Sequence, residues 1–109
     1  MEVKVLDVKW QRPTVTIHAS DGKAFRKYLS AGYYVFKREN GQCTMRKKAL
    51  IFVTFEENGK IETLNLRKEL ACFYGTNKTE QLVEMFQDDL KQGQIKLKVD
   101  SKGYYFVKE

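Results

Sequence analysis

The chain has 109 residues, 42% of them hydrophobic and 13% aromatic, with a formal net charge of +6 at pH 7. This length fits one domain, and a single proline with seven glycines excludes a disordered or low-complexity chain. Because the first residues lack a signal-peptide pattern and no apolar stretch approaches the roughly 20 residues of a membrane span, we expect one cytoplasmic domain over residues 1–109 without membrane association.

Two β-strands are predicted first, at residues 3–10 and 14–19, where β-branched residues are frequent. They flank a break that contains Pro13, so together they predict a β-hairpin. On the first strand, Leu6, Val8 and Trp10 share one face. On the second strand, His18 falls on the same face as two threonines, which indicates a surface histidine on the more polar face.

A short helix is predicted at residues 24–30, where Phe25, Tyr28 and Leu29 stand at helical spacing. The next segment, residues 33–38, is rich in rings and predicts a strand. By parity, its even positions fall on one face of that strand and its odd positions on the other. Tyr34, Phe36 and Arg38 would then share one face, opposite Tyr33, Val35 and Lys37.

Two Asn-Gly pairs, at residues 40–41 and 58–59, predict tight hairpin turns. Between them, apolar residues alternate from Cys43 to Phe55 with only Lys47 interrupting, which predicts one long strand. A third strand at residues 61–64 would pair back onto it. The sequence therefore predicts a three-stranded meander in the middle of the chain.

Two helices and a last hairpin are predicted in the remaining residues. The first helix follows from the spacing of Leu66, Leu70 and Phe73 and ends at Gly75. The second begins at a capping box and ends near Gly93. The capping box is Asn77 with Glu80, and the apolar stripe behind it is Leu82, Val83, Phe86 and Leu90. Residues 95–99 and 104–107 alternate and predict the hairpin.

The resulting fold class is α+β, with about seven mostly antiparallel strands and two to three short helices. So many strands in a short chain favour closure into a small barrel, because closure removes exposed sheet edges. In element order and size this outline is similar to PUA-like, OB-like and SH3-like barrels. The resemblance implies such a barrel, and several of these families bind nucleic acid.

The residue types that carry catalysis and metal binding do not form a recognisable pattern. The chain lacks nucleotide-binding, metalloprotease and serine-hydrolase motifs, and the adjacent carboxylates at residues 56–57 and 88–89 do not converge on a site. Cys43 and Cys72 stand far apart and outside any metal-ligand spacing, which indicates two buried free thiols. We expect neither an enzyme, nor a metal site, nor a cofactor.

Positive charge is concentrated between Lys23 and Lys48, where eight basic residues accompany one acid, Glu39. Five aromatic rings are interleaved with these charges, a combination that is typical of proteins that bind phosphates and stack bases. We therefore expect a non-enzymatic regulator of gene expression that binds RNA, single-stranded or structured, in preference to duplex DNA. The expected contact residues are Lys23, Arg26, Lys27, Tyr33, Tyr34, Lys37, Arg38, Arg46, Lys47 and Lys48.

Within that set, Arg38, Arg46 and Lys48 are expected to form one basic ridge near the turn at residues 40–41. Three alternatives stay open. The same basic face fits an acidic protein partner, with the tyrosines as anchors. A small-molecule pocket inside the barrel is a second alternative. Finally, lysines and arginines on strand faces are often only solvated.

Overall fold

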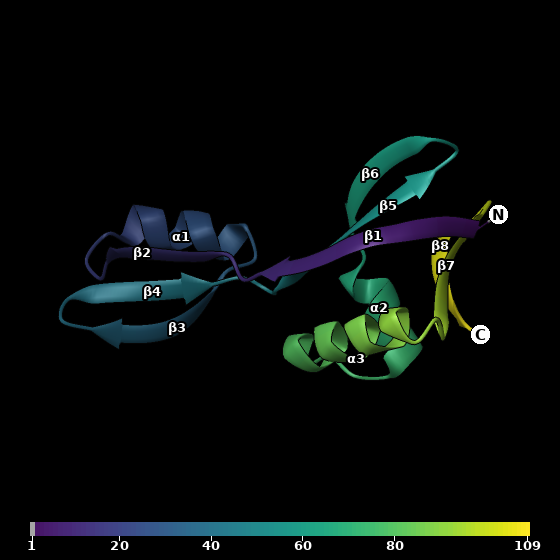
Figure 1. Cartoon of the computed structure of the whole chain (residues 1–109). Helices are drawn as coiled ribbons and strands as arrows, with labels where there is room; N and C mark the ends of the chain where they lie inside the picture. Colours follow the sequence, from purple (N-terminus) through teal and green to yellow (C-terminus); the bar gives the residue numbers. More distant parts are fainter. Residues whose placement is uncertain (1) are drawn as a thin grey trace. The chain divides into compact units, whose positions relative to one another are not determined.

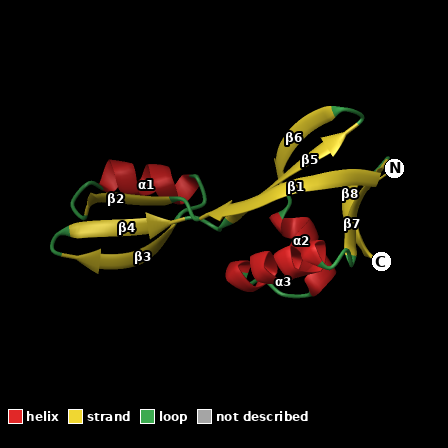
Figure 2. Cartoon of the chain, in the orientation of Figure 1, coloured by secondary structure: helices red, strands yellow, loops and turns green. Residues whose placement is uncertain are grey.

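The computed structural model describes residues 2–109, which form eight strands in two antiparallel sheets and three helices (Figures 1 and 2). The elements in chain order are β1 (Glu2–Gln11), β2 (Thr14–His18), α1 (Gly22–Ser30), β3 (Tyr34–Glu39), β4 (Gln42–Arg46), β5 (Leu50–Glu57), β6 (Lys60–Asn65), α2 (Arg67–Tyr74), α3 (Thr79–Lys91), β7 (Ile95–Asp100) and β8 (Gly103–Lys108). These elements separate into two compact units.

The discontinuous unit consists of the residues up to Trp10 together with Leu50–Glu109. Its five-stranded sheet has the order β6-β5-β1-β7-β8, and α2 and α3 lie on the same side of it in Figure 1. Phe86 of α3 is fully buried and packs edge-on against Phe106 of β8, with ring centroids 5.1 Å apart. The core thus forms between one sheet face and the two helices, and it includes the apolar stripe predicted for the second of them.

The inserted unit is Gln11–Ala49, which lies between β1 and β5 in the sequence. It holds α1 and a three-stranded antiparallel sheet with the order β2-β4-β3. Cys43 and Met45 of the central strand are buried, whereas their neighbours along β4 are not. The Asp21 carboxylate caps α1 by accepting a hydrogen bond from the Ala24 amide at 3.0 Å, and this helix confirms the one predicted at residues 24–30.

The predicted small barrel of PUA-like, OB-like or SH3-like form is wrong, because residues 2–109 form no closed barrel. Two pairing predictions account for the error. The strand expected from residue 43 to residue 55 is interrupted at residues 47–49, so that β4 and β5 belong to different sheets. The hairpin expected from β1 and β2 does not form either, since β1 lies between β5 and β7 while β2 pairs with β4.

On β1, Val3 and Val8 are buried, whereas Leu6 and Trp10 are 43% and 39% exposed. Two local predictions are also corrected by the structure. Cys72 is exposed rather than buried, although Cys43 is buried as expected. The capping box at residues 77–80 is absent, since α3 begins without a side-chain cap.

The residue expected to open that capping box has another role. The backbone carbonyl of Asn77 accepts a hydrogen bond from the buried Arg67 guanidinium at 2.7 Å, and Arg67 Nε lies 3.5 Å from the Thr79 hydroxyl. Arg67 is the first residue of α2, and Thr79 is the first residue of α3. This side chain therefore ties the starts of the two helices together.

Candidate nucleic-acid interface

The positive charge of the chain follows the division into units. The inserted unit contains nine lysines and arginines against two acids, a net charge of +7, whereas the rest of the chain contains eleven against twelve. All ten residues predicted to contact nucleic acid lie within the inserted unit. The electrostatic attraction for a polyanion therefore belongs to these 39 residues and not to the whole protein.

A β-bulge decides which side chains share a face of the inserted sheet. Val35 pairs with Met45, but the next pair along β3 is Lys37 with Thr44, so that Phe36 is an extra residue without a partner. Since one inserted residue reverses the faces of everything beyond it, the parity expected for residues 33–38 holds only up to the bulge. Arg38 consequently pairs with buried Cys43 and lies on the opposite face from Tyr34.

One face of the sheet is covered by α1. This covered face carries the buried side chains of β4, together with Val15 and Ile17 from β2 and Val35 and Arg38 from β3. The Arg38 guanidinium lies 5.5 Å from the centroid of the Phe25 ring of α1, which fixes the helix on this side. Tyr33 also packs on the helix, edge-on against Tyr28 with centroids 5.2 Å apart.

The opposite face, which we call the open face, has no element of the inserted unit over it. Paired residues of antiparallel strands share a face, and none of its residues is buried. Those residues are Thr14, Thr16 and His18 of β2, Gln42, Thr44 and Arg46 of β4, and Tyr34, Lys37 and Glu39 of β3. Hydroxyl, amide, imidazole, guanidinium and ammonium groups are thus displayed side by side, with rings at one end.

A stacked pair lies at one end of the open face. The Arg46 guanidinium lies over the Phe36 ring, 3.5 Å from its centroid, which keeps the ring of the bulged residue on this face. Phe36 nevertheless stays 48% exposed and Tyr34 45% exposed. Within residues 2–109, the buried Nε of Arg46 has no hydrogen-bond partner. The other N–H groups of a guanidinium that lies over a ring can still bind an oxygen acceptor.

Two further contacts organise the charges near this pair. Arg12 Nη1 donates a hydrogen bond to the Tyr34 hydroxyl at 3.2 Å, so that a second guanidinium stands at the same end of the face. Lys37 forms an exposed ion pair with Glu39 at 2.8 Å. Exposed pairs of this kind are weak and readily exchanged for another anion.

The expected ridge of Arg38, Arg46 and Lys48 is not assembled by the structure. Arg38 and Arg46 lie on opposite faces of the sheet, and Lys48 is exposed in the segment that leaves β4. Lys47 lies with its ammonium 5.9 Å from the Tyr33 ring, on the helix side. Tyr34, Lys37 and Arg46 are the predicted residues that share the open face.

Sequence reasoning did not place Arg12, Phe36 and the threonines of the open face in the candidate interface. Phe36 had a visible signal, since it lies among basic residues and rings in the sequence. Its exposure depends on the bulge, which no local pattern in residues 33–38 marks. The signal for Arg12 was absent, because its position beside Tyr34 follows from the pairing of β2 with β4.

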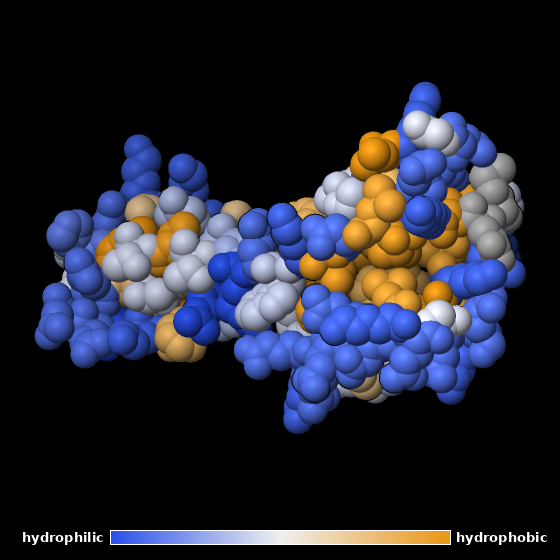
Figure 3. Space-filling model, in the orientation of Figure 1, coloured by the Kyte–Doolittle hydropathy of each residue, from blue (hydrophilic) through white to orange (hydrophobic). Residues whose placement is uncertain are grey.

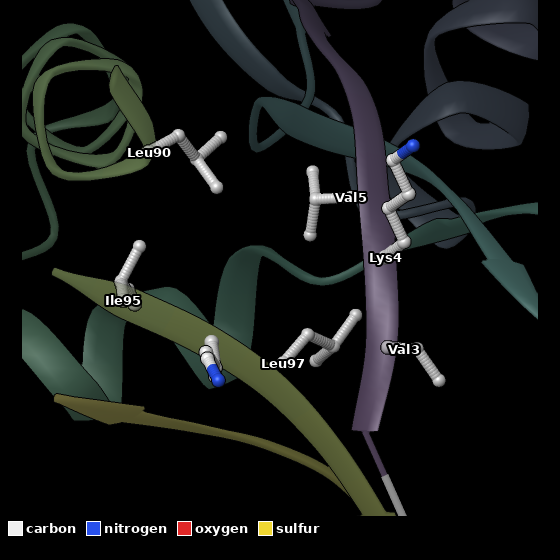
Figure 4. Close-up of a pocket in the computed structure, with 7 residues that line it drawn as sticks. Val3, Lys4, Val5, Leu90, Ile95 and Leu97 are labelled. Atoms are coloured by element: carbon white, nitrogen blue, oxygen red, sulfur yellow. The ribbon is translucent and has the colours of Figure 1, made fainter. Parts of the chain in front are cut away.

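The discontinuous unit contains a pocket of about 380 Å³ at the place where β1 and β7 diverge. Among the residues that the structure describes, these strands pair at residues 2–3 with residues 97–98. Figure 4 shows Val5, Leu90, Ile95 and Leu97 around the space, whereas Lys4 turns away from it. Its lining is mainly apolar, in keeping with the hydrophobic surface on this unit in Figure 3.

Residues 2–109 lack two kinds of functional feature, a metal-ligand cluster and a helix that could span a membrane. The described part of the chain has no cluster of three or more His, Cys, Asp or Glu side chains that could share a metal ion. None of its helices combines the length and the apolar character that crossing a membrane requires. Comparison of the chain with protein-family models, curated proteins and solved structures gives no significant match.

Proposed function

We propose that this protein is a cytoplasmic, non-enzymatic regulator that binds single-stranded or looped RNA through the open face of its inserted unit. The observation that carries the proposal is the Arg46 guanidinium stacked on the exposed Phe36 ring. It combines a phosphate-binding cation and a base-stacking ring on one sheet face, which are the two components of single-strand recognition.

Single-stranded RNA fits the open face better than duplex DNA does. Tyr34 and Phe36 each leave about half of their surface exposed. A base can stack on such a ring only when the face of the base is free. Bases in a duplex are stacked on each other, whereas those in loops and single strands are available. The threonine hydroxyls of the open face add hydrogen-bonding groups suited to base edges and to the 2′-hydroxyl.

The charges of the open face lie next to its rings. Arg12 and Arg46 lie at the end of the face where the rings are, and Lys37 lies one residue beyond the bulge. A strand whose bases stack on the rings would therefore carry its phosphates past these cations. Each phosphate neutralised this way releases counterions, so we expect binding to weaken steeply with salt.

Fluorescence anisotropy with labelled single-stranded RNA, single-stranded DNA and duplex DNA tests the proposal. The binding variant is Lys37→Gln with Arg46→Gln, and the matched control is Lys60→Gln with Lys78→Gln, which removes the same charge from exposed positions of the discontinuous unit. We expect the binding variant to lose at least tenfold in RNA affinity and the control to bind like the wild type.

Two results would overturn the proposal. Equal binding of all three nucleic acids, seen at low salt alone, would mean that the inserted unit is a general cation surface. Binding of none of them, together with co-purification of one acidic protein, would assign the same face to a protein partner instead.

A further inference from the structure

A second basic surface lies on the solvent side of α1. Lys23, Arg26 and Lys27 stand at the first, fourth and fifth positions of one helical repeat, and all three are exposed. Residues at this spacing occupy one side of a helix. We call these three residues the helix stripe.

The helix stripe points away from the sheet. Ala24, Phe25 and Tyr28 fall on the other side of the helix, are half-buried, and include the rings that contact Arg38 and Tyr33. Because α1 lies on the face opposite the open face, the whole thickness of the helix and the sheet separates the two basic surfaces. A helix with its side chains is about 10–12 Å across, so the gap is at least that wide.

The inserted unit neutralises little of its own positive charge. Its two acids are Asp21, which caps the helix backbone, and Glu39, which pairs with Lys37. The described residues show no ion pair for any member of the helix stripe. The unit is therefore positively charged on two opposite sides.

The two surfaces differ in what they offer a ligand. The open face presents exposed rings, and those rings stack unpaired bases. On the helix side, Phe25 and Tyr28 are half-buried, and the Lys27 ammonium lies 5.7 Å from the centroid of the Tyr28 ring, so the stripe offers cations with less exposed ring surface than the open face does. Cations alone contact the phosphates of any strand without reading its bases.

We propose that the inserted unit holds two RNA segments at the same time, one stacked on the open face and one bound by its phosphates along the helix stripe, and so bridges them. This inference rests on the proposed function for the first segment. The covered sheet and the helix stand between the two surfaces, so a strand stacked on the open face would have to run around the edge of the unit to reach the helix stripe. The bulge contributes to the separation of the cations, since it moves Arg38 to the helix side and leaves Arg46 on the open face.

The experiment uses the full chain and two non-complementary RNA oligonucleotides of about eight nucleotides, a length within the site sizes of about 4–16 nucleotides found on small binding domains. One oligonucleotide carries a donor dye and the other an acceptor. Energy transfer between them reports bridging, native mass spectrometry counts the RNAs on each chain, and anisotropy measures the first binding step.

The variant is Lys23→Gln with Arg26→Gln and Lys27→Gln, and its matched control is Lys60→Gln with Lys78→Gln and Lys91→Gln, all exposed. We expect the wild type and the control to bind two RNAs per chain and to give energy transfer. The stripe variant should bind one RNA, with its first-step affinity within about threefold of the wild type and energy transfer at background. The second step in the wild type should have a salt slope near −2, from three contacts at about 0.7 each.

Three other outcomes would overturn the bridging inference, and one of them would overturn the proposed function as well. One RNA per wild-type chain at saturation, with binding intact, would overturn the bridging inference and leave the proposed function standing. Energy transfer that survives in the stripe variant would place the second strand elsewhere, for example on a second copy of the chain, and would also overturn it. Absence of RNA binding altogether would overturn the proposed function and the bridging inference with it.

Discussion

The exposed ring of the bulge gives the most direct test of base stacking, through Phe36→Ala. The side chain is 48% exposed, so about half of its surface is already removed from water in the folded protein. Full burial of a phenylalanine contributes about 1.5–3 kcal/mol, and the contact with the Arg46 guanidinium adds about 0.5–1 kcal/mol at an exposed site. We therefore expect a loss of about 1–2 kcal/mol in stability, which a domain of ordinary stability survives.

The effect of this substitution on RNA binding should be larger than its effect on folding. A base stacked on an aromatic side chain contributes about 1–3 kcal/mol, which corresponds to a loss of about 5- to 150-fold in affinity. The salt slope should stay unchanged, because the ring carries no charge. Arg46→Gln, in contrast, removes a charge and should therefore lower the salt slope by about 0.7 through the loss of one phosphate contact.

Anisotropy titrations with single-stranded RNA, combined with thermal unfolding, separate these effects. Phe36→Tyr is the conservative control, since it keeps the ring and should bind within about threefold of the wild type. Val35→Ala is the positional control, because its side chain pairs with Met45 on the helix-covered face and should not affect binding. A folded Phe36→Ala protein that binds RNA as tightly as the wild type would refute the stacking role of the open face.

Three further predictions concern the discontinuous unit. Phe86→Ala removes a fully buried ring and should lower the free energy of unfolding by about 3–5 kcal/mol in urea titrations, whereas Gln87→Ala, at an exposed position, should change it by less than about 0.5 kcal/mol. Arg67→Met leaves a backbone carbonyl without its donor at 2.7 Å and should cost about 1–3 kcal/mol in the same assay, so wild-type stability would contradict a role for this hydrogen bond. Burial and the hydrogen bond to Glu57 raise the pKa of Tyr104 from 10.0 to about 12. Folding therefore favours the neutral phenol, and this stabilisation should be present below pH 10 and lost as the pH rises toward 12. An absorbance titration should show a phenol that ionises above pH 10, and Tyr104→Phe should remove this signal.

The sequence by itself determined the local elements whose geometry a few neighbouring residues enforce. The Asn40-Gly41 and Asn58-Gly59 turns both form with positive φ at each residue, as their hairpins require. Gly75 ends α2 in the left-handed conformation that other residues rarely adopt. The amphipathic spacing of Phe25 and Tyr28 likewise marked α1, and the charge of residues 23–48 located the candidate interface.

Tertiary structure decided how these elements pair and which faces they expose. Alternation from Cys43 to Phe55 is compatible with one strand or with two, and only the pairing partners place the break at residues 47–49. The strands β1 and β2 are neighbours in sequence, but each finds its partners far along the chain. Closure into a barrel was expected from the number of strands, and it was wrong because local patterns carry no information on long-range partners.

The bulge at Phe36 shows the same limit at the scale of one residue. Local sequence gave the correct strand and turn, yet the faces beyond the bulge were reversed, so that Arg38 and Arg46 were predicted together and lie apart. Side chains alternate with a period of two, and a single unpaired residue therefore exchanges the two faces completely. Composition determined that the segment is basic and aromatic, whereas the register of β3 on β4 decided which cations and rings meet, because that register depends on contacts between strands and not on either strand alone.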